Sequence, residues 1–101
     1  MTDFVRVAAA GDIPKGEGRA FEVNGRNVAV FNSGGTFYAI ENECKHQGGP
    51  LAEGELDGTT VTCPWHAWMY DVGSGECEEE PDCHVETFEV KLEGEDVLVK
   101  A

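Results

Sequence analysis

Short runs of alternating apolar and polar residues, separated by glycine-rich turns, fill most of this chain. Alternation with a period of two is typical of strands, and many short strands with frequent turns indicate an all-β sandwich or barrel. No window has a persuasive helical period. The predicted strands lie at residues 4–8, 19–23, 27–32, 36–40, 59–62, 68–71, 87–92 and 96–100.

Turn residues join several of these runs. The dipeptide Asn24-Gly25 supplies the positive φ angles that tight hairpins need, so we expect a hairpin between the second and third strands. Gly34 and Gly35 predict a turn before the fourth strand, and Gly94 predicts a hairpin between the last two.

The stretch from Glu41 to about His84 departs from this pattern. It holds all four cysteines, all three histidines and three of the four prolines, and much of it is loop-like. A long irregular segment inside a compact domain is usually functional or disordered. Because ligand-type residues gather here, we expect a site-bearing insertion on a β platform.

The length of 101 residues suits a single domain spanning residues 1–101. Residues 1–6 show no secretory signal, and no apolar run approaches the roughly 18 residues that span a bilayer. We therefore expect a cytoplasmic protein that does not enter membranes. In that reducing compartment, four cysteines favour metal binding over disulfides.

Acidic residues dominate the charge, with 20 Asp and Glu against 7 Lys and Arg and a formal net charge of −13. Such a surface repels nucleic acids and attracts a partner with a basic patch. The same charge is also explained by solubility or by a high-salt habitat, and the sequence leaves these explanations open.

Two Cys–His pairs carry the candidate chemistry. Cys44 and His46 form the first pair, and Cys63 and His66 form the second. Two cysteines plus two histidines are the ligand set of a [2Fe–2S] cluster with Cys on one iron and His on the other. Each pair would then give one ligand to each iron.

Neighbouring residues suit such a site. Gly48 and Gly49 allow the backbone to approach a cluster closely, and N–H groups directed at its sulfur raise the reduction potential. Leu51, Trp65 and Trp68 are candidates for shielding it from water.

A structural zinc site is the alternative, since Cys₂His₂ is also a common zinc ligand set. Zinc sites usually pair Cys with Cys and His with His, whereas each pair here mixes the two types. Iron–sulfur is therefore the favoured interpretation, and four unrelated side chains the least favoured.

The segments 44–51 and 63–71 resemble the two-loop motif of Rieske proteins, and residues 87–93 are similar to the C-terminal strand of Rieske ferredoxins. The resemblance covers nearly the whole chain. It implies three antiparallel sheets, with a small cluster-binding subdomain at about residues 42–84 inserted in a β base domain. It also implies that both histidines bind iron through Nδ1 at an exposed tip.

Within that family, several positions set the expected potential. High-potential Rieske proteins have a disulfide where Gly49 and Trp65 stand here, and a serine hydroxyl donor where Trp68 stands. Tyr70 matches the family's tyrosine, whose hydroxyl reaches the sulfur at the position of Cys44. Because fewer hydrogen bonds reach the cluster sulfur, we expect a reduction potential in the low-to-middle part of the family's range of about −150 to +300 mV.

The resemblance also implies a third, proline-containing loop over the cluster, which Pro81 matches. Cys77 and Cys83 flank this proline. We expect them to pack as small apolar side chains, with a disulfide or redox role as the alternative. His84 is expected to lie on the surface, because four ligands already complete the cluster.

The resemblance implies a one-electron carrier and not an enzyme. It would be monomeric when free and would pass electrons from a flavin-containing NAD(P)H reductase to a terminal oxygenase of the aromatic-ring dioxygenase type. The alternative is a small subunit bound permanently to the large subunit of an NADH-dependent nitrite reductase or to another redox complex.

Overall fold

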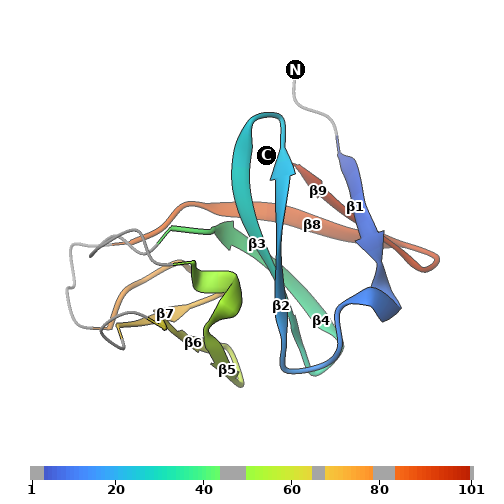
Figure 1. Ribbon diagram of the computed structural model, residues 1–101. Coiled ribbons are helices and arrows are strands. Elements are labelled where there is room, and N and C mark those ends of the chain that lie inside the picture. The colour runs from blue at the N-terminus through green and yellow to red at the C-terminus, as the bar shows by residue number, and fades with distance from the viewer. Residues whose placement is uncertain (1–3, 44–49, 65–67, 79–83, 101) are drawn as a thin grey trace.

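The computed structural model describes residues 4–43, 50–64, 68–78 and 84–100, and these residues form nine strands and two 3-10 helices (Figure 1). The predicted all-β class is confirmed, and each predicted strand is present with ends that differ by at most one residue. The elements are β1 (Val5–Ala9), η1 (Ala10–Asp12), β2 (Gly18–Val23), β3 (Arg26–Ser33), β4 (Thr36–Glu41), η2 (Leu51–Glu53), β5 (Glu55–Asp57), β6 (Thr60–Thr62), β7 (Met69–Asp71), β8 (Thr87–Glu93) and β9 (Asp96–Lys100). Neither helix of the described residues is long and apolar enough to cross a membrane.

Six strands form a large antiparallel sheet in the order β1-β9-β8-β4-β3-β2, which we call the base. Strand β8 joins its two halves, because Thr87 and Phe88 pair with β4 while residues 89–93 pair with β9. Strands β5, β6 and β7 form a separate small sheet, also antiparallel. The two halves of the base and the small sheet are the three antiparallel sheets expected.

The predicted turns are confirmed. Asn24 and Gly25 have φ angles of +52° and +80°, and they form the two-residue turn between β2 and β3. Gly34 and Gly35 connect β3 to β4, and Gly94 lies in the turn between β8 and β9. Residues that tolerate positive φ therefore set the register of three hairpins.

The small sheet comes from the part of the chain between β4 and β8, so it is an insertion between strands of the base. The boundaries at about residues 42–84 stay a prediction. The sequence pattern does not predict β5, because Leu56 is its only apolar residue. Its pairing with β6, where Leu56 lies opposite Val61, comes from the partner strand.

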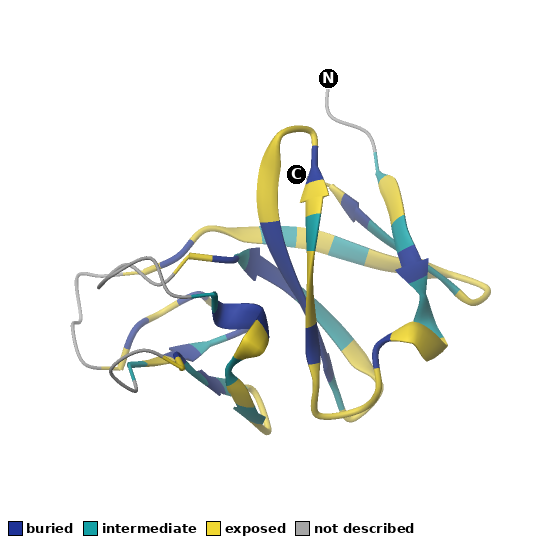
Figure 2. Ribbon diagram, viewed as in Figure 1, coloured by how far each residue is buried: buried dark blue, intermediate teal, exposed yellow. Residues whose placement is uncertain are grey.

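Strand β3 is buried over most of its length (Figure 2), and two apolar clusters pack on its opposite faces. Val28 and Val30 belong to one cluster, and Ala29 and Phe31 belong to the other, as the alternation of a strand requires. The Phe31 cluster continues into the small-sheet region, where it includes Leu51, Ala52, Val61, Cys63, Tyr70, Val72, Cys77 and Val85. Apolar packing thus attaches the small sheet to the base.

Candidate metal centre

Cys63 directly follows β6, and hydrogen bonds fix its backbone at one end of the small sheet. Thr62 lies opposite Met69, and the Cys63 N–H donates to the Trp68 carbonyl oxygen at 2.7 Å. Cys63 is 1% exposed and packs in the same cluster as Tyr70. The protein therefore surrounds this predicted ligand with apolar groups that limit access of water.

The chain on either side of residues 44–49 is held together. Glu43 and Pro50 form an isolated antiparallel bridge. Just after it, Leu51 is fully buried and packs in the same cluster as Cys63. The chain that flanks Cys44 and His46 is thus anchored to the same apolar core that surrounds Cys63.

The chain on either side of residues 79–83 extends the small sheet. Cys77 forms a bridge with Tyr70, and the Glu78 N–H donates to the Met69 carbonyl oxygen at 2.9 Å. On the other side of this segment, His84 forms a bridge with Glu76. Because Met69 contacts both neighbouring segments, the flanks of residues 65–67 and 79–83 lie at the same end of the small sheet (Figure 1).

The structure describes four of the predicted site residues. Cys63, Leu51 and Tyr70 are buried, and Trp68 is half-buried against the same cluster. The other predicted site residues lie outside the described part of the chain, and their roles stay predictions: Cys44, His46, Gly48, Gly49, Trp65, His66 and Pro81.

Cys77 is 5% exposed and belongs to the apolar cluster, which confirms that it packs as an apolar side chain. Cys83 lies outside the described residues, so a pairing with Cys77 stays open. His84 is exposed, as expected for a surface residue.

The residues placed here fit a cluster with two Cys and two His ligands. The Cys63 thiol is buried beside apolar groups, and the chain flanking the first pair is fixed beside the same core. Within the described ranges, no group of three or more His, Cys, Asp and Glu residues is arranged for another metal. The donor set itself, two thiols and two imidazoles, is the one that Rieske clusters use.

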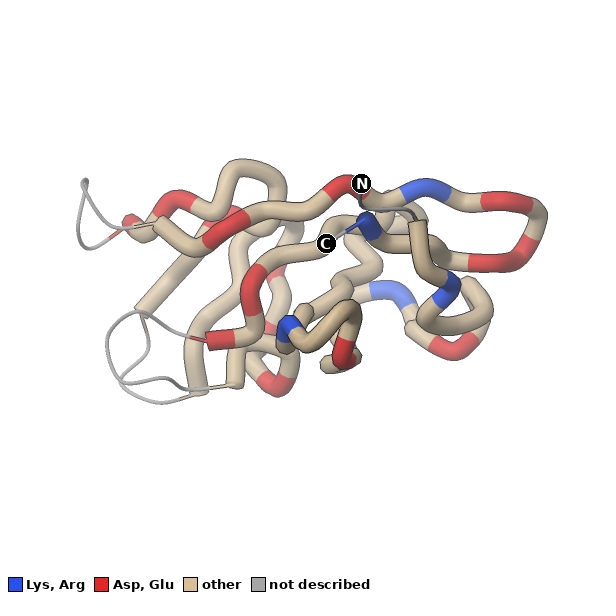
Figure 3. Tube along the Cα trace, turned by 90° about the horizontal axis from the view of Figure 1, so that it is seen from above, with Lys and Arg blue, Asp and Glu red and all other residues tan. Residues whose placement is uncertain are grey.

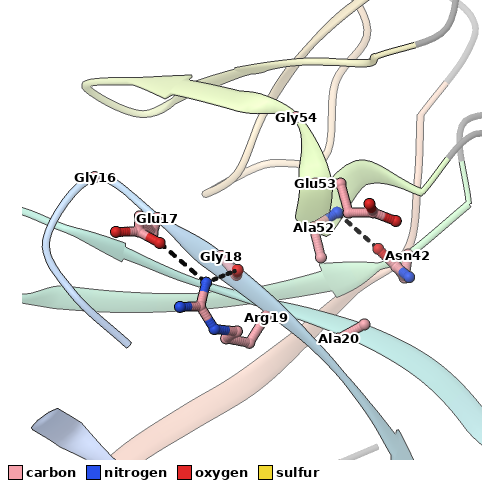
Figure 4. A pocket seen from close by; sticks show the side chains of 9 residues that line it. All are labelled: Gly16, Glu17, Gly18, Arg19, Ala20, Asn42, Ala52, Glu53 and Gly54. Carbon is pink, nitrogen blue, oxygen red and sulfur yellow. Dashed lines mark hydrogen bonds and ion pairs between the residues drawn. The ribbon is translucent and has the colours of Figure 1, made fainter. Parts of the chain in front are cut away.

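A groove of about 410 Å³ is lined by residues of β2, of η2 and of their neighbouring segments (Figure 4). None of its described lining residues is a predicted ligand, but they include Asn42, which the sequence pattern did not single out. The available signal was its position, one residue after β4 and two before Cys44. Its lining residues are Gly16, Glu17, Gly18, Arg19, Ala20, Asn42, Ala52, Glu53 and Gly54.

Charge is distributed unevenly over the molecule. Residues 46–90 contain eleven Asp and Glu and no Lys or Arg. Figure 3 shows acidic positions along the end that carries the small sheet, whereas the basic positions of the described residues lie on the base. Several of these Lys and Arg side chains form exposed ion pairs with acidic side chains, such as Arg6 with Asp96 at 2.8 Å. The molecule therefore has an acidic end and a nearly neutral one.

This chain resembles known proteins in both sequence and fold. The sequence matches the Rieske [2Fe–2S] domain over residues 3–97. The ferredoxin component of biphenyl 2,3-dioxygenase from Rhodococcus jostii strain RHA1 is 38% identical over 97 residues, covering 95% of this chain and 91% of that protein. A chain from the complex of reduced oxygenase and oxidized ferredoxin in carbazole 1,9a-dioxygenase is 32% identical, with a TM-score of 0.87 over 96% of this chain and 92% of that one.

A Mycobacterium tuberculosis chain, provisionally assigned as an NADH-dependent nitrite reductase small subunit, superposes with a TM-score of 0.93. The superposition covers 100% of this chain and 96% of the other. At 18% identity, this likeness shows the fold alone.

Proposed function

This chain belongs to the Rieske [2Fe–2S] domain family, and on that basis we propose that it is a one-electron carrier, the ferredoxin component of a multicomponent oxygenase system. The observation that carries this proposal is the 38% identity to a dioxygenase ferredoxin component over nearly the full length of both chains. The sequence has no Gly-x-Gly-x-x-Gly dinucleotide motif and no further set of His and carboxylate residues for a mononuclear iron. We therefore infer a carrier and not an oxygenase.

We assign cluster binding to Cys44, His46, Cys63 and His66, with one thiolate and one imidazole from each pair. The buried position of Cys63 and the family membership of the chain support this assignment. When bound, such a cluster takes up and releases one electron at a time. The chain's own contribution is to hold the four ligands and to limit access of water.

Residues around Cys63 are proposed to set the potential. Leu51 and Tyr70 are fully buried beside it, and we propose that the Tyr70 hydroxyl donates to the sulfur of Cys44. Trp68 supplies no hydroxyl in the place of the serine of high-potential relatives. Because few hydrogen-bond donors reach the cluster sulfur, we expect a midpoint reduction potential in the low-to-middle part of the Rieske range, which is about −150 to +300 mV.

We propose a flavin-containing NAD(P)H reductase as electron donor and a terminal oxygenase as acceptor. One relative of this chain was solved in a complex of reduced oxygenase and oxidized ferredoxin, which supports the second partner. The acidic end of the molecule favours partners with basic surfaces. The carrier is proposed to be monomeric when free and to work in the reducing cytoplasm, where four cysteines serve metal binding better than disulfides.

The alternative, a permanent small subunit of an NADH-dependent nitrite reductase, is supported by likeness of fold at 18% identity. The two proposals differ in a simple observation on the natural source. A permanent subunit is purified together with a large subunit in constant proportion, whereas a free carrier elutes alone.

An anaerobic reductive titration tests the proposed function. We expect the wild-type protein to be coloured and to take up one electron per chain. Cys63→Ser removes a ligand, so the colour and the electron uptake should be lost. Cys77→Ser is the matched control, because Cys77 is also buried in the same cluster but is not an assigned ligand.

Cys77→Ser should keep the spectrum and one-electron uptake, with some loss of stability. A colourless wild-type protein that binds zinc and takes up no electron would contradict the proposed function. Equal loss of the cluster in both variants would contradict the assignment of Cys63 as a specific ligand.

A further inference from the structure

The side chain of Asn42 connects the chain before the first ligand pair to the chain after it. Asn42 is 5% exposed and stands two residues before Cys44. Its Oδ1 accepts a hydrogen bond from the Ala52 N–H at 2.7 Å (Figure 4). The bond lies just outside the bridge between Glu43 and Pro50, so two successive interactions join the chain that precedes residues 44–49 to the chain that follows them.

This hydrogen bond also completes η2. The first N–H groups of a helix have no partner within it, and the residue before η2 is Pro50, which provides no side-chain cap. The Ala52 N–H is one of these groups, and Asn42 serves as its acceptor from outside the helix. Loss of the acceptor would leave a buried donor without a partner in the protein, which is costly.

Asn42 is itself anchored to the base. Its backbone N–H donates to the Asn27 carbonyl oxygen at 3.0 Å, and its Nδ2 donates to Asn27 Oδ1 at 3.3 Å. Leu51, next to Ala52, packs in the same cluster as Cys63. One amide group therefore connects β3, the start of the first ligand segment and the core around Cys63.

We propose that Asn42 is a positioning residue for the cluster, because it holds the ends of the segment carrying Cys44 and His46 beside the core that contains Cys63. This proposal rests on the assignment of those residues as ligands. It concerns retention of the cluster and its spectroscopic properties, because the hydrogen bonds described for Asn42 are made to Asn27 and Ala52. Removing a residue that orients metal ligands without binding the metal itself typically lowers metal affinity about 10- to 100-fold.

The chain offers a matched control in Asn32. This residue is 6% exposed, and both polar atoms of its amide form hydrogen bonds: Nδ2 donates to the Ile13 carbonyl oxygen at 2.7 Å, and Oδ1 accepts from the Gly35 N–H at 2.8 Å. It lies opposite Phe37, at the other end of β3 from Asn27. Loss of either amide removes comparable buried hydrogen bonds, but only Asn42 borders a ligand segment.

The test compares Asn42→Ala and Asn32→Ala in the cluster-loaded protein. The measurements are the EPR spectrum of the reduced form, the midpoint potential and the rate of bleaching by an iron chelator. We expect Asn42→Ala to bleach at least about tenfold faster than wild type, with a changed EPR spectrum and a shifted midpoint. Asn32→Ala should be less stable to urea but should keep the wild-type spectrum and midpoint, with bleaching within about twofold of wild type.

Two further variants keep the test decisive. Asn42→Ser has a side chain too short to reach Ala52, and it replaces Asn42→Ala if that variant does not fold. Asn42→Asp keeps an acceptor oxygen, and the Asn27 amide can turn to donate to it, so its bleaching should be slower than that of Asn42→Ala.

Bleaching and EPR of Asn42→Ala or Asn42→Ser equal to those of Asn32→Ala would overturn the proposal. A wild-type protein without a Rieske EPR signal would instead overturn the proposed function before any variant is compared.

Discussion

At the scale of single residues, burial alone does not separate a metal ligand from a packing residue. Cys63 and Cys77 are 1% and 5% exposed and belong to the same apolar cluster. Of these two cysteines, only Cys63 is followed within three residues by a histidine, His66. A similar Cys–His pair, Cys44 and His46, occurs earlier in the chain. Sequence spacing therefore identifies Cys63 as the candidate ligand. The structure shows that apolar side chains around Cys63 limit its contact with water.

Gly75 is a residue whose importance appears only in the structure. It has a φ of +79°, and a Cβ there would lie 2.2 Å from the Val85 carbonyl oxygen. Its N–H donates to the Asp71 carbonyl oxygen at 2.7 Å, and its own carbonyl accepts from the Val85 N–H at 2.8 Å. Gly75 thus ties the end of β7 to the chain that returns to the base.

Gly75→Ala should destabilise the protein strongly, because it combines a left-handed backbone with a close contact. We expect a loss of about 2–3 kcal/mol, or a melting temperature lower by roughly 10 °C or more. Gly94→Ala is the control: its φ is +63°, but its Cβ would meet nothing within 4 Å, so only about 1 kcal/mol should be lost. Thermal melts followed by circular dichroism measure both, and equal losses would show that the contact with Val85 is not important.

At the scale of elements, local sequence signals predicted most of the base. Hairpins such as β2–β3 follow from alternation and from Asn24-Gly25, which act within a few residues. Strand β5 and the bridges at Glu43 and Cys77 depend on partner segments that a local pattern does not reveal. The donor types of the site were visible in the sequence, but the anchoring by Asn42 was not, because it joins residues ten positions apart through a side chain.

At the scale of the whole molecule, the net charge of −13 becomes informative only when it is placed on the fold. Nine of the twenty acidic residues lie outside residues 46–90, but so do all seven Lys and Arg residues. Residues 46–90 carry eleven acids and no Lys or Arg, and they include the small sheet with the candidate centre. This asymmetry favours electrostatic guidance of a basic partner toward that end.

Charge variants test this guidance. Glu76→Gln with Glu78→Gln removes two exposed charges at the small-sheet end, and Glu22→Gln with Glu95→Gln removes two from the base. With cytochrome c as a basic acceptor at low salt, we expect the first pair to slow electron transfer about threefold and the second to have little effect. The difference should shrink as salt approaches about 1 M, where screening is nearly complete. Equal slowing by both pairs in stopped-flow experiments would argue for net charge alone.

We propose that this fold holds a [2Fe–2S] cluster through two cysteines and two histidines. Pulsed EPR of the reduced wild-type protein tests it most directly, because it detects nitrogen nuclei bound to the iron. We expect a Rieske-type signal with coupling to the nitrogens of two imidazoles, and loss of one of these couplings in His66→Cys. A reduced protein whose iron shows no coupling to histidine nitrogen, or a protein that contains zinc and gives no signal, would contradict it.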